Sequence, residues 1–123
     1  MAKWNYFDHK DLSDETFFGM NDFDAYQHKA SLTAIYPKEV ALEYTALGLT
    51  SEAGEFASKI KKKIRDGVFN QHEAMAELGD VLWYVAMASQ ALGYTLSEVA
   101  EYNLQKLKDR QERNKITGSG DFR

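Results

Sequence analysis

Apolar residues recur every three or four positions along most of the chain, which is the spacing of one face of an α-helix. The longest such pattern is Leu42, Ala46, Leu49, Ala53, Phe56, Ile60 and Ile64. It predicts a helix over about residues 38–65. Pro37 suits the first turn of this helix, and Asp66-Gly67 predicts its end because glycine readily takes the left-handed conformation that closes helices.

A shorter helix is predicted before it. Asn21 or Asp22 is a suitable N-cap, and the pattern continues to about residue 34. Tyr36 precedes Pro37, and a residue before proline avoids the α region, so the two helices are expected to be separate.

The third predicted helix spans residues 70–92 and ends at Gly93. Asn70 and Glu73 have the spacing of a capping box. The second half of the helix, residues 81–92, is apolar on nearly all sides, yet it is shorter than the ~20 apolar residues that cross a bilayer. A helix of this kind needs cover all round. Four helices in one chain supply too little cover, so we expect an oligomer.

Thr95 and Glu98 form a second capping box, which predicts a fourth helix to about residue 114 with Val99, Leu104 and Leu107 facing inward. Four helices with short connections indicate a bundle. We therefore expect an all-α, four-helix bundle-like chain that completes its core by oligomerisation. Residues 1–20 are expected to be an irregular arm, 21–116 the helical domain and 117–123 a glycine-rich tail.

Composition narrows the function classes. The chain has 123 residues, a net charge of −4 and no cysteine. Thiolate metal sites and disulfides are excluded, and the acidic balance disfavours a nucleic-acid partner, even one bound by the basic stretch 59–65. The N-terminus lacks the apolar run of a secretory signal, no membrane partner is expected, and a cytoplasmic setting fits.

Two carboxylate pairs carry the strongest chemical signal. Glu52 and Glu55 are three residues apart in the second predicted helix, and Glu77 and Asp80 are three apart in the third. Residues at this spacing project from one side of a helix, and a short connection favours antiparallel packing of the two helices. Clustered carboxylates repel one another, and a hard cation such as Mg²⁺ or Mn²⁺ relieves that repulsion. Glycine lies inside each pair, which leaves room for close approach.

Other interpretations stay open beside the metal site. A single acid pair on a helix is usually a solvated face, and a non-catalytic helical oligomer that binds a structural cation or a nucleotide is the main alternative. A di-iron bundle is disfavoured because it needs Glu-x-x-His on two helices, whereas His9, His28 and His72 are scattered.

Several residues are candidates for substrate contact. Lys59 follows Glu55 by one helical turn, and its alternative role is a solvated helix end. Asn103, Lys106 and Arg110 share one face of the fourth helix and would suit a polyphosphate, although a charged stripe is normally exterior. Tyr84 lies one turn after Asp80, where it would stack on a base or pack in the core.

These motifs resemble the MazG-like branch of the all-α NTP pyrophosphatase superfamily. The stretches that carry the resemblance are 23–27, 49–55, 77–84, 103–110 and 118–121. Together they cover about residues 22–121 in the family's order, and the two acid motifs are the most specific.

The resemblance implies hydrolysis of a nucleoside triphosphate, expected to be a deoxynucleotide, to a monophosphate and diphosphate, with a role in nucleotide-pool control. It also implies Mg²⁺ and a homodimer or a homotetramer built as a dimer of dimers. The residues it places are the metal ligands Glu52, Glu55, Glu77 and Asp80 and the substrate contacts Tyr84, Asn103 and Lys106.

Roles in the reaction follow as expectations. Glu52 or Glu55 would orient or deprotonate the attacking water, and Lys59 and Lys106 would offset charge on the leaving diphosphate. Base recognition is expected near Phe23, Tyr26 and Gln27. Many family members have glutamate where this chain has Ser51, which leaves the number of metals open.

Overall fold

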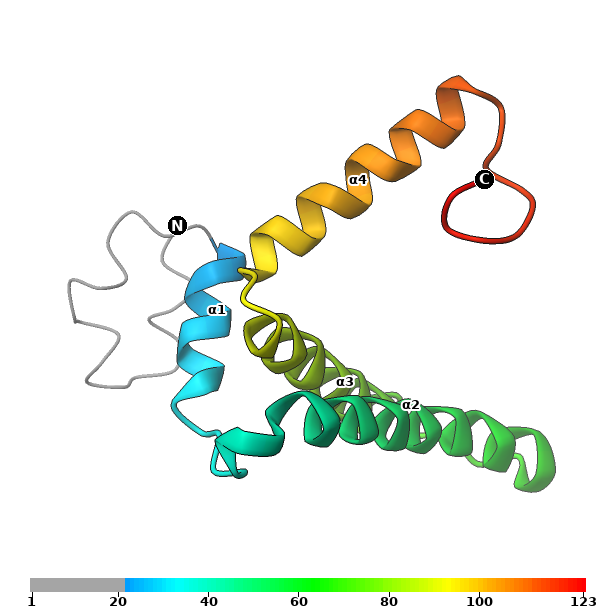
Figure 1. The fold of residues 1–123 in the computed structure, drawn as a ribbon. Coiled ribbons are helices and arrows are strands. Elements are labelled where there is room, and N and C mark those ends of the chain that lie inside the picture. The colour runs from blue at the N-terminus through cyan, green and yellow to red at the C-terminus, as the bar shows by residue number, and fades with distance from the viewer. Residues whose placement is uncertain (1–21) are drawn as a thin grey trace.

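A computed structural model describes residues 22–123, and all regular elements in that range are helical (Figure 1). The elements are α1 (Asp22–Ser31), the 3-10 helix η4 (Lys38–Val40), α2 (Ala41–Asp66), α3 (Gln71–Ala91) and α4 (Leu96–Glu112). The all-α prediction is confirmed. The predicted irregular arm 1–20, the cap at Asn21 and His9 lie outside the described residues.

The start of α2 differs from the prediction. Pro37 has an extended backbone, and the residues after it form η4 instead of the first α-helical turn. Val40, the last residue of η4 and the N-cap of α2, has φ −121° and ψ 27°, which interrupts the α-helical conformation. The predicted end is confirmed, because Gly67 has a φ of 73° and its N–H donates to the carbonyl of Lys63.

Side-chain caps begin the next two helices, although only the Asn70 half of the capping box predicted with Glu73 is formed, and Glu73 contacts Lys59 instead. The Asn70 side chain accepts hydrogen bonds from the backbone N–H groups of His72 and Glu73. At α4 both bonds of the capping box form: Glu98 N–H donates to Thr95 Oγ1 at 3.1 Å, and Thr95 N–H donates to Glu98 Oε1 at 2.8 Å. These local bonds fix where each helix begins.

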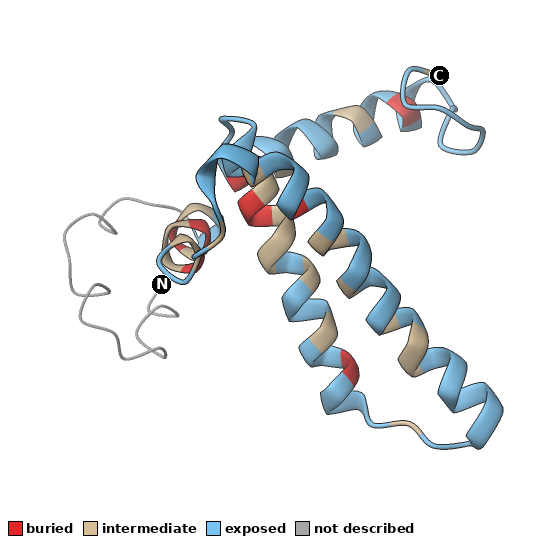
Figure 2. Ribbon diagram, turned by 60° about the horizontal axis from the view of Figure 1, so that its bottom comes forward, coloured by how far each residue is buried: buried red, intermediate tan, exposed pale blue. Residues whose placement is uncertain are grey.

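Helices α2 and α3 form a long antiparallel hairpin, while α4 leads away from it (Figure 1). The buried residues concentrate where α1 meets the end of α3 and the start of α4 (Figure 2). This core contains Ala30, Ala86, Met87 and Leu96, with Tyr26, Ala34, Tyr36, Trp83 and Val85 packed against it. The core is therefore at one end of the hairpin.

A contact from α1 fixes the start of α4. Asp24 accepts hydrogen bonds from the backbone N–H and the hydroxyl of Ser97, at 2.9 and 2.8 Å. A carboxylate at a helix N-terminus satisfies free N–H groups and interacts favourably with the helix dipole. Helix α1 thus helps to set the direction in which α4 leaves the core.

The described part of one chain does not close a four-helix bundle. Val99, Leu104 and Leu107 are 38%, 63% and 40% exposed, so the prediction that they face inward is wrong for the single chain. The physical reason is that α4 has no neighbouring helix along most of its length (Figure 1). Leu82, in the apolar half of α3, is also exposed.

Two glycines of α2 are expected to respond oppositely to substitution by alanine. A Cβ at Gly48 would collide with the ring of Tyr84, whereas a Cβ at Gly54 would meet nothing within 4 Å. Gly48→Ala should lower the free energy of unfolding by about 1–3 kcal/mol, the usual cost of overpacking. Gly54→Ala should raise it by up to about 1 kcal/mol, the gain in helix propensity. Urea unfolding of both variants, metal-free, tests the pair, and equal effects would contradict the close contact between Gly48 and Tyr84.

Candidate functional site

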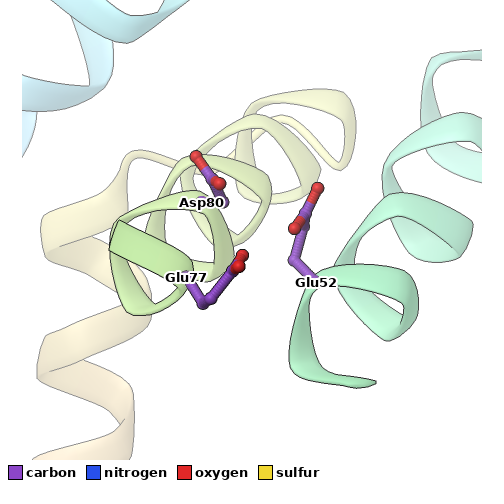
Figure 3. A group of neighbouring side chains, drawn as sticks. All are labelled: Glu52, Glu77 and Asp80. Atoms are coloured by element: carbon purple, nitrogen blue, oxygen red, sulfur yellow. The ribbon is translucent and has the colours of Figure 1, made fainter. Parts of the chain in front are cut away.

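Three carboxylates converge between the facing sides of α2 and α3. Glu52 comes from the middle of α2, and Glu77 and Asp80 come from the first half of α3 (Figure 3). Each offers one oxygen, and these oxygens all lie within 4.8 Å of one another. Glu52 and Glu77 are half-buried, and Asp80 is exposed. The antiparallel hairpin thus brings the two predicted acid motifs together.

Glu55 is the one predicted metal ligand outside this group of three. It lies nearly one turn beyond Glu52 on α2, and its side chain is exposed. Its charge is nevertheless close enough to contribute to the raised pKa of Glu52. Glu55 is therefore placed at the border of the cluster.

The cluster is electrostatically unfavourable without a cation. Burial raises the pKa of Glu52, and the negative charges of Asp80, Glu77 and Glu55 raise it further. A divalent cation held between these oxygens would remove the repulsion. Oxygen-only donors fit Mg²⁺ or Mn²⁺, and the described residues place no histidine in the group.

Lys59 borders the cluster on the α2 side. Its Nζ lies 3.5 Å from Glu73 Oε1 and 3.7 Å from Glu77 Oε1. Its side chain is 27% exposed. The lysine predicted to contact phosphate therefore neutralises part of the acid cluster in this structure.

An aromatic cluster lies next to the acids. Tyr84 meets Trp83 edge-on, with ring centroids 4.9 Å apart, and lies 6.5 Å from the Tyr44 ring. Burial raises the pKa of Tyr84, with further contributions from Tyr44 and from the charges of Glu52 and Asp80. The predicted base-stacking residue therefore borders the carboxylates.

Reasoning from the sequence missed Tyr44 and Tyr36, whose rings stack with centroids 5.0 Å apart. The sequence does contain a pattern that places Tyr44 near the acids. Tyr44, Gly48 and Glu52 follow one another at four-residue spacing, which places them on one face of a helix. Tyr36 precedes Pro37 in a connection and has no such periodic signal.

The predicted contacts on α4 lie apart from the acid cluster in the single chain. Lys106 and Arg110 contact Asp121 of the C-terminal loop, which curls back at the far end of α4 (Figure 1). Asn103 is exposed on the same helix. One chain by itself therefore does not bring these side chains to Glu52, Glu77 and Asp80.

Gln27 is buried and holds the fold together. Its Nε2 donates to the carbonyls of Ala86 and Tyr94 at 3.0 and 3.2 Å, and its Oε1 accepts from the Leu96 N–H at 3.0 Å. The amide is thus committed to the junction of α1, α3 and α4, and the predicted substrate contact gains no support from this arrangement.

No helix within residues 22–123 combines the length and apolar character needed to cross a membrane.

Comparison with known proteins gives two matches. The sequence profile of a family described as the MazG nucleotide pyrophosphohydrolase domain matches residues 41–114, which contain α2, α3 and α4 up to its end. The chain is also 48% identical over 111 residues to the Gene 37 protein of Mycobacterium phage L5, covering 81% of this chain and 97% of that protein. No solved structure matches.

Proposed function

The chain belongs to the MazG nucleotide pyrophosphohydrolase family, and from this premise we propose that it hydrolyses a nucleoside triphosphate, preferably a deoxynucleotide, to a monophosphate and diphosphate with Mg²⁺. The family acts on nucleoside triphosphates and depends on divalent cations. The observation that carries the proposal is the convergence of Glu52, Glu77 and Asp80 from facing helices. Three oxygen donors at this separation suit a cation that accompanies a triphosphate.

The acids have two tasks in the proposed reaction. Glu52, Glu77 and Asp80 would hold Mg²⁺, or Mn²⁺ as a substitute. The chemistry that such a cation would supply is polarisation of the phosphoryl oxygen and activation of a water molecule. Glu55, exposed at the border, or Glu52 accepts the proton of the attacking water.

Cationic and aromatic side chains complete the proposed site. Lys59 lies close enough to the acids to exchange its contact with Glu77 for one with the leaving diphosphate. Tyr84 borders the acids and offers a ring face to the base. Asn103, Lys106 and Arg110 lie on the projecting α4, so in this proposal they contact substrate bound to the acids of a second copy.

We further propose that the chain assembles as a homodimer or a dimer of dimers. The hairpin exposes large apolar side chains, namely Leu42, Tyr44, Leu47, Ile60 and Ile64 on α2 and Met75, Leu78 and Leu82 on α3. So many exposed large apolar side chains on one hairpin are typical of a protein contact surface. A second copy would cover this face and provide the neighbour that α4 lacks.

Sedimentation equilibrium tests the assembly. Leu47, 73% exposed, tolerates a polar side chain in the single chain, so Leu47→Glu should shift the mass towards the monomer while leaving the helix content unchanged. Gln71→Glu introduces the same charge at an exposed polar position at the start of α3 and should leave the mass unchanged. A wild-type chain that is monomeric at high micromolar concentration would refute the assembly.

A nucleotide panel tests the activity. The chain is incubated with each canonical and modified ribo- and deoxynucleoside triphosphate in Mg²⁺, and monophosphate and diphosphate are separated by ion-exchange chromatography. We expect equimolar monophosphate and diphosphate, abolished by EDTA and restored by excess Mg²⁺. If the products are inorganic phosphate and a nucleoside diphosphate, or if no substrate is turned over, the proposal is contradicted.

A further inference from the structure

The C-terminal loop places the carboxylate of Asp121 next to two cationic side chains of α4, Lys106 and Arg110. Asp121 Oδ1 lies 3.2 Å from Lys106 Nζ and 3.4 Å from Arg110 Nη2. Positive φ angles at Gly118 and Gly120, 118° and 85°, allow the loop to fold back against the helix. The carboxylate therefore lies in front of both cations.

The loop is attached to α4 independently of this carboxylate. Arg110 Nη2 donates to the backbone carbonyls of Asp121 and Gly120 at 2.5 and 3.5 Å. Arg113, the C-cap of α4, donates from Nη2 to the carbonyl of Arg123 at 2.7 Å. Removal of the Asp121 carboxylate should leave these backbone contacts intact.

Arg110 has a hydrogen-bond donor without a partner in the described residues, and both Lys106 and Arg110 line a cavity. Arg110 is 5% exposed, and its Nε is a buried donor with no hydrogen-bond partner in the described part of the chain. Lys106 and Arg110 both line a cavity of about 340 Å³ that also includes Tyr102 and Arg113. The positive charges of Lys106 and Arg110 would stabilise an anion bound in this cavity.

We propose that Lys106 and Arg110 form an anion-binding site and that Asp121 sets its affinity by occupying it in the free chain. The anion is a polyphosphate group, and its identity as part of a nucleoside triphosphate rests on the proposed function. An incoming phosphate displaces the Asp121 side chain, while the backbone contacts of Arg110 keep the loop in place. Asp121 thereby limits binding to anions with enough charge to compete, which favours triphosphates and diphosphate over single phosphates.

Another acidic residue at the C-terminal end of α4 provides a matched control for the Asp121 substitution. Glu112, the last residue of α4, is exposed and is not among the residues that line the cavity of Lys106 and Arg110. Glu112→Gln and Asp121→Asn each remove one negative charge from the same end of α4. Only the second should unblock the cationic pair.

The test is calorimetric titration of the full chain with inorganic tripolyphosphate in EDTA at low salt, where no metal or turnover contributes. Asp121→Asn should bind roughly two- to fivefold more tightly than wild type, the range for an exposed ion pair, and the difference should shrink as salt rises. The affinity of Glu112→Gln should stay within about twofold of wild type. Asp121→Ser removes the carboxylate by another route and should behave as Asp121→Asn does.

Each other outcome overturns the proposal or separates it from the proposed function. Weaker or equal binding by both Asp121 variants would show that the acid only fastens the loop or orients the cations. Equal gains in Glu112→Gln and Asp121→Asn would show that net charge alone acts. The gain must disappear when Lys106→Met is added. If the wild type hydrolyses no nucleotide but Asp121→Asn still gains affinity, the anion site stands and the hydrolytic function fails.

Discussion

Asp80→Asn is expected to abolish diphosphate release and, at the same time, to raise the melting temperature of the metal-free protein. The first effect follows because one of three converging oxygen donors loses its charge, and loss of a single preorganised electrostatic contact in an active site typically costs about 10²–10³ in kcat. The second follows because the negative charge of Asp80 raises the pKa of Glu52, so its removal relieves repulsion. Steady-state assay and thermal unfolding in EDTA measure the two effects.

Glu73→Gln is the matched control for this variant. Glu73 also lies in the first half of α3 and contacts Lys59, but it is outside the group of three carboxylates. It should keep activity within about threefold of wild type, since an exposed ion pair contributes only ~0.2–1 kcal/mol. An Asp80→Asn enzyme with near-wild-type turnover would remove the metal site from the proposed mechanism.

Met87→Ala is expected to cause the largest loss of stability. Met87 is fully buried where α1, α3 and α4 meet, and the core there is small. Truncation of a buried methionine to alanine costs about 2–5 kcal/mol, from lost burial and the cavity left behind. Guanidinium unfolding should show a lower midpoint, with a slope that stays close to that of wild type.

Ile35→Ala is the control that distinguishes the effect of burial on stability from the effect of side-chain size. This substitution also deletes three heavy atoms, but Ile35 is 96% exposed. Its free energy of unfolding should stay within about 0.5 kcal/mol of wild type, as for surface substitutions generally. Similar losses in the two variants would mean that the core is not centred on Met87.

The sequence was sufficient to predict those features of the fold that depend on residues close together in the chain. Helix periodicity and local caps such as Thr95 with Glu98 act within one turn, so the elements were predicted closely. The facing acid motifs also followed, because a short connection between two long helices leaves antiparallel packing as the simple outcome. The change from α to 3-10 geometry after Pro37 is a small local energy difference that periodicity does not register.

The direction of α4 could not be predicted in the same way. It depends on Asp24 and Gln27, which bond to groups about sixty to seventy residues away in the sequence. Nothing in their local pattern indicates those partners. Burial was overestimated for a related reason: the apolar face of Leu104 and Leu107 has the same pattern whether it is covered within the chain or by another copy.

The contact between α1 and α4 has a consequence for the smallest unit that can be studied. The family match begins at residue 41, but the groups that aim α4 belong to residues before it. A fragment trimmed to the match would retain Lys106 and the acids yet lose the parts that hold α4 at its angle. Residues 22–31 therefore belong to the same structural unit as α2–α4, and a graft of α2–α4 onto another scaffold would need a substitute for Asp24 and Gln27.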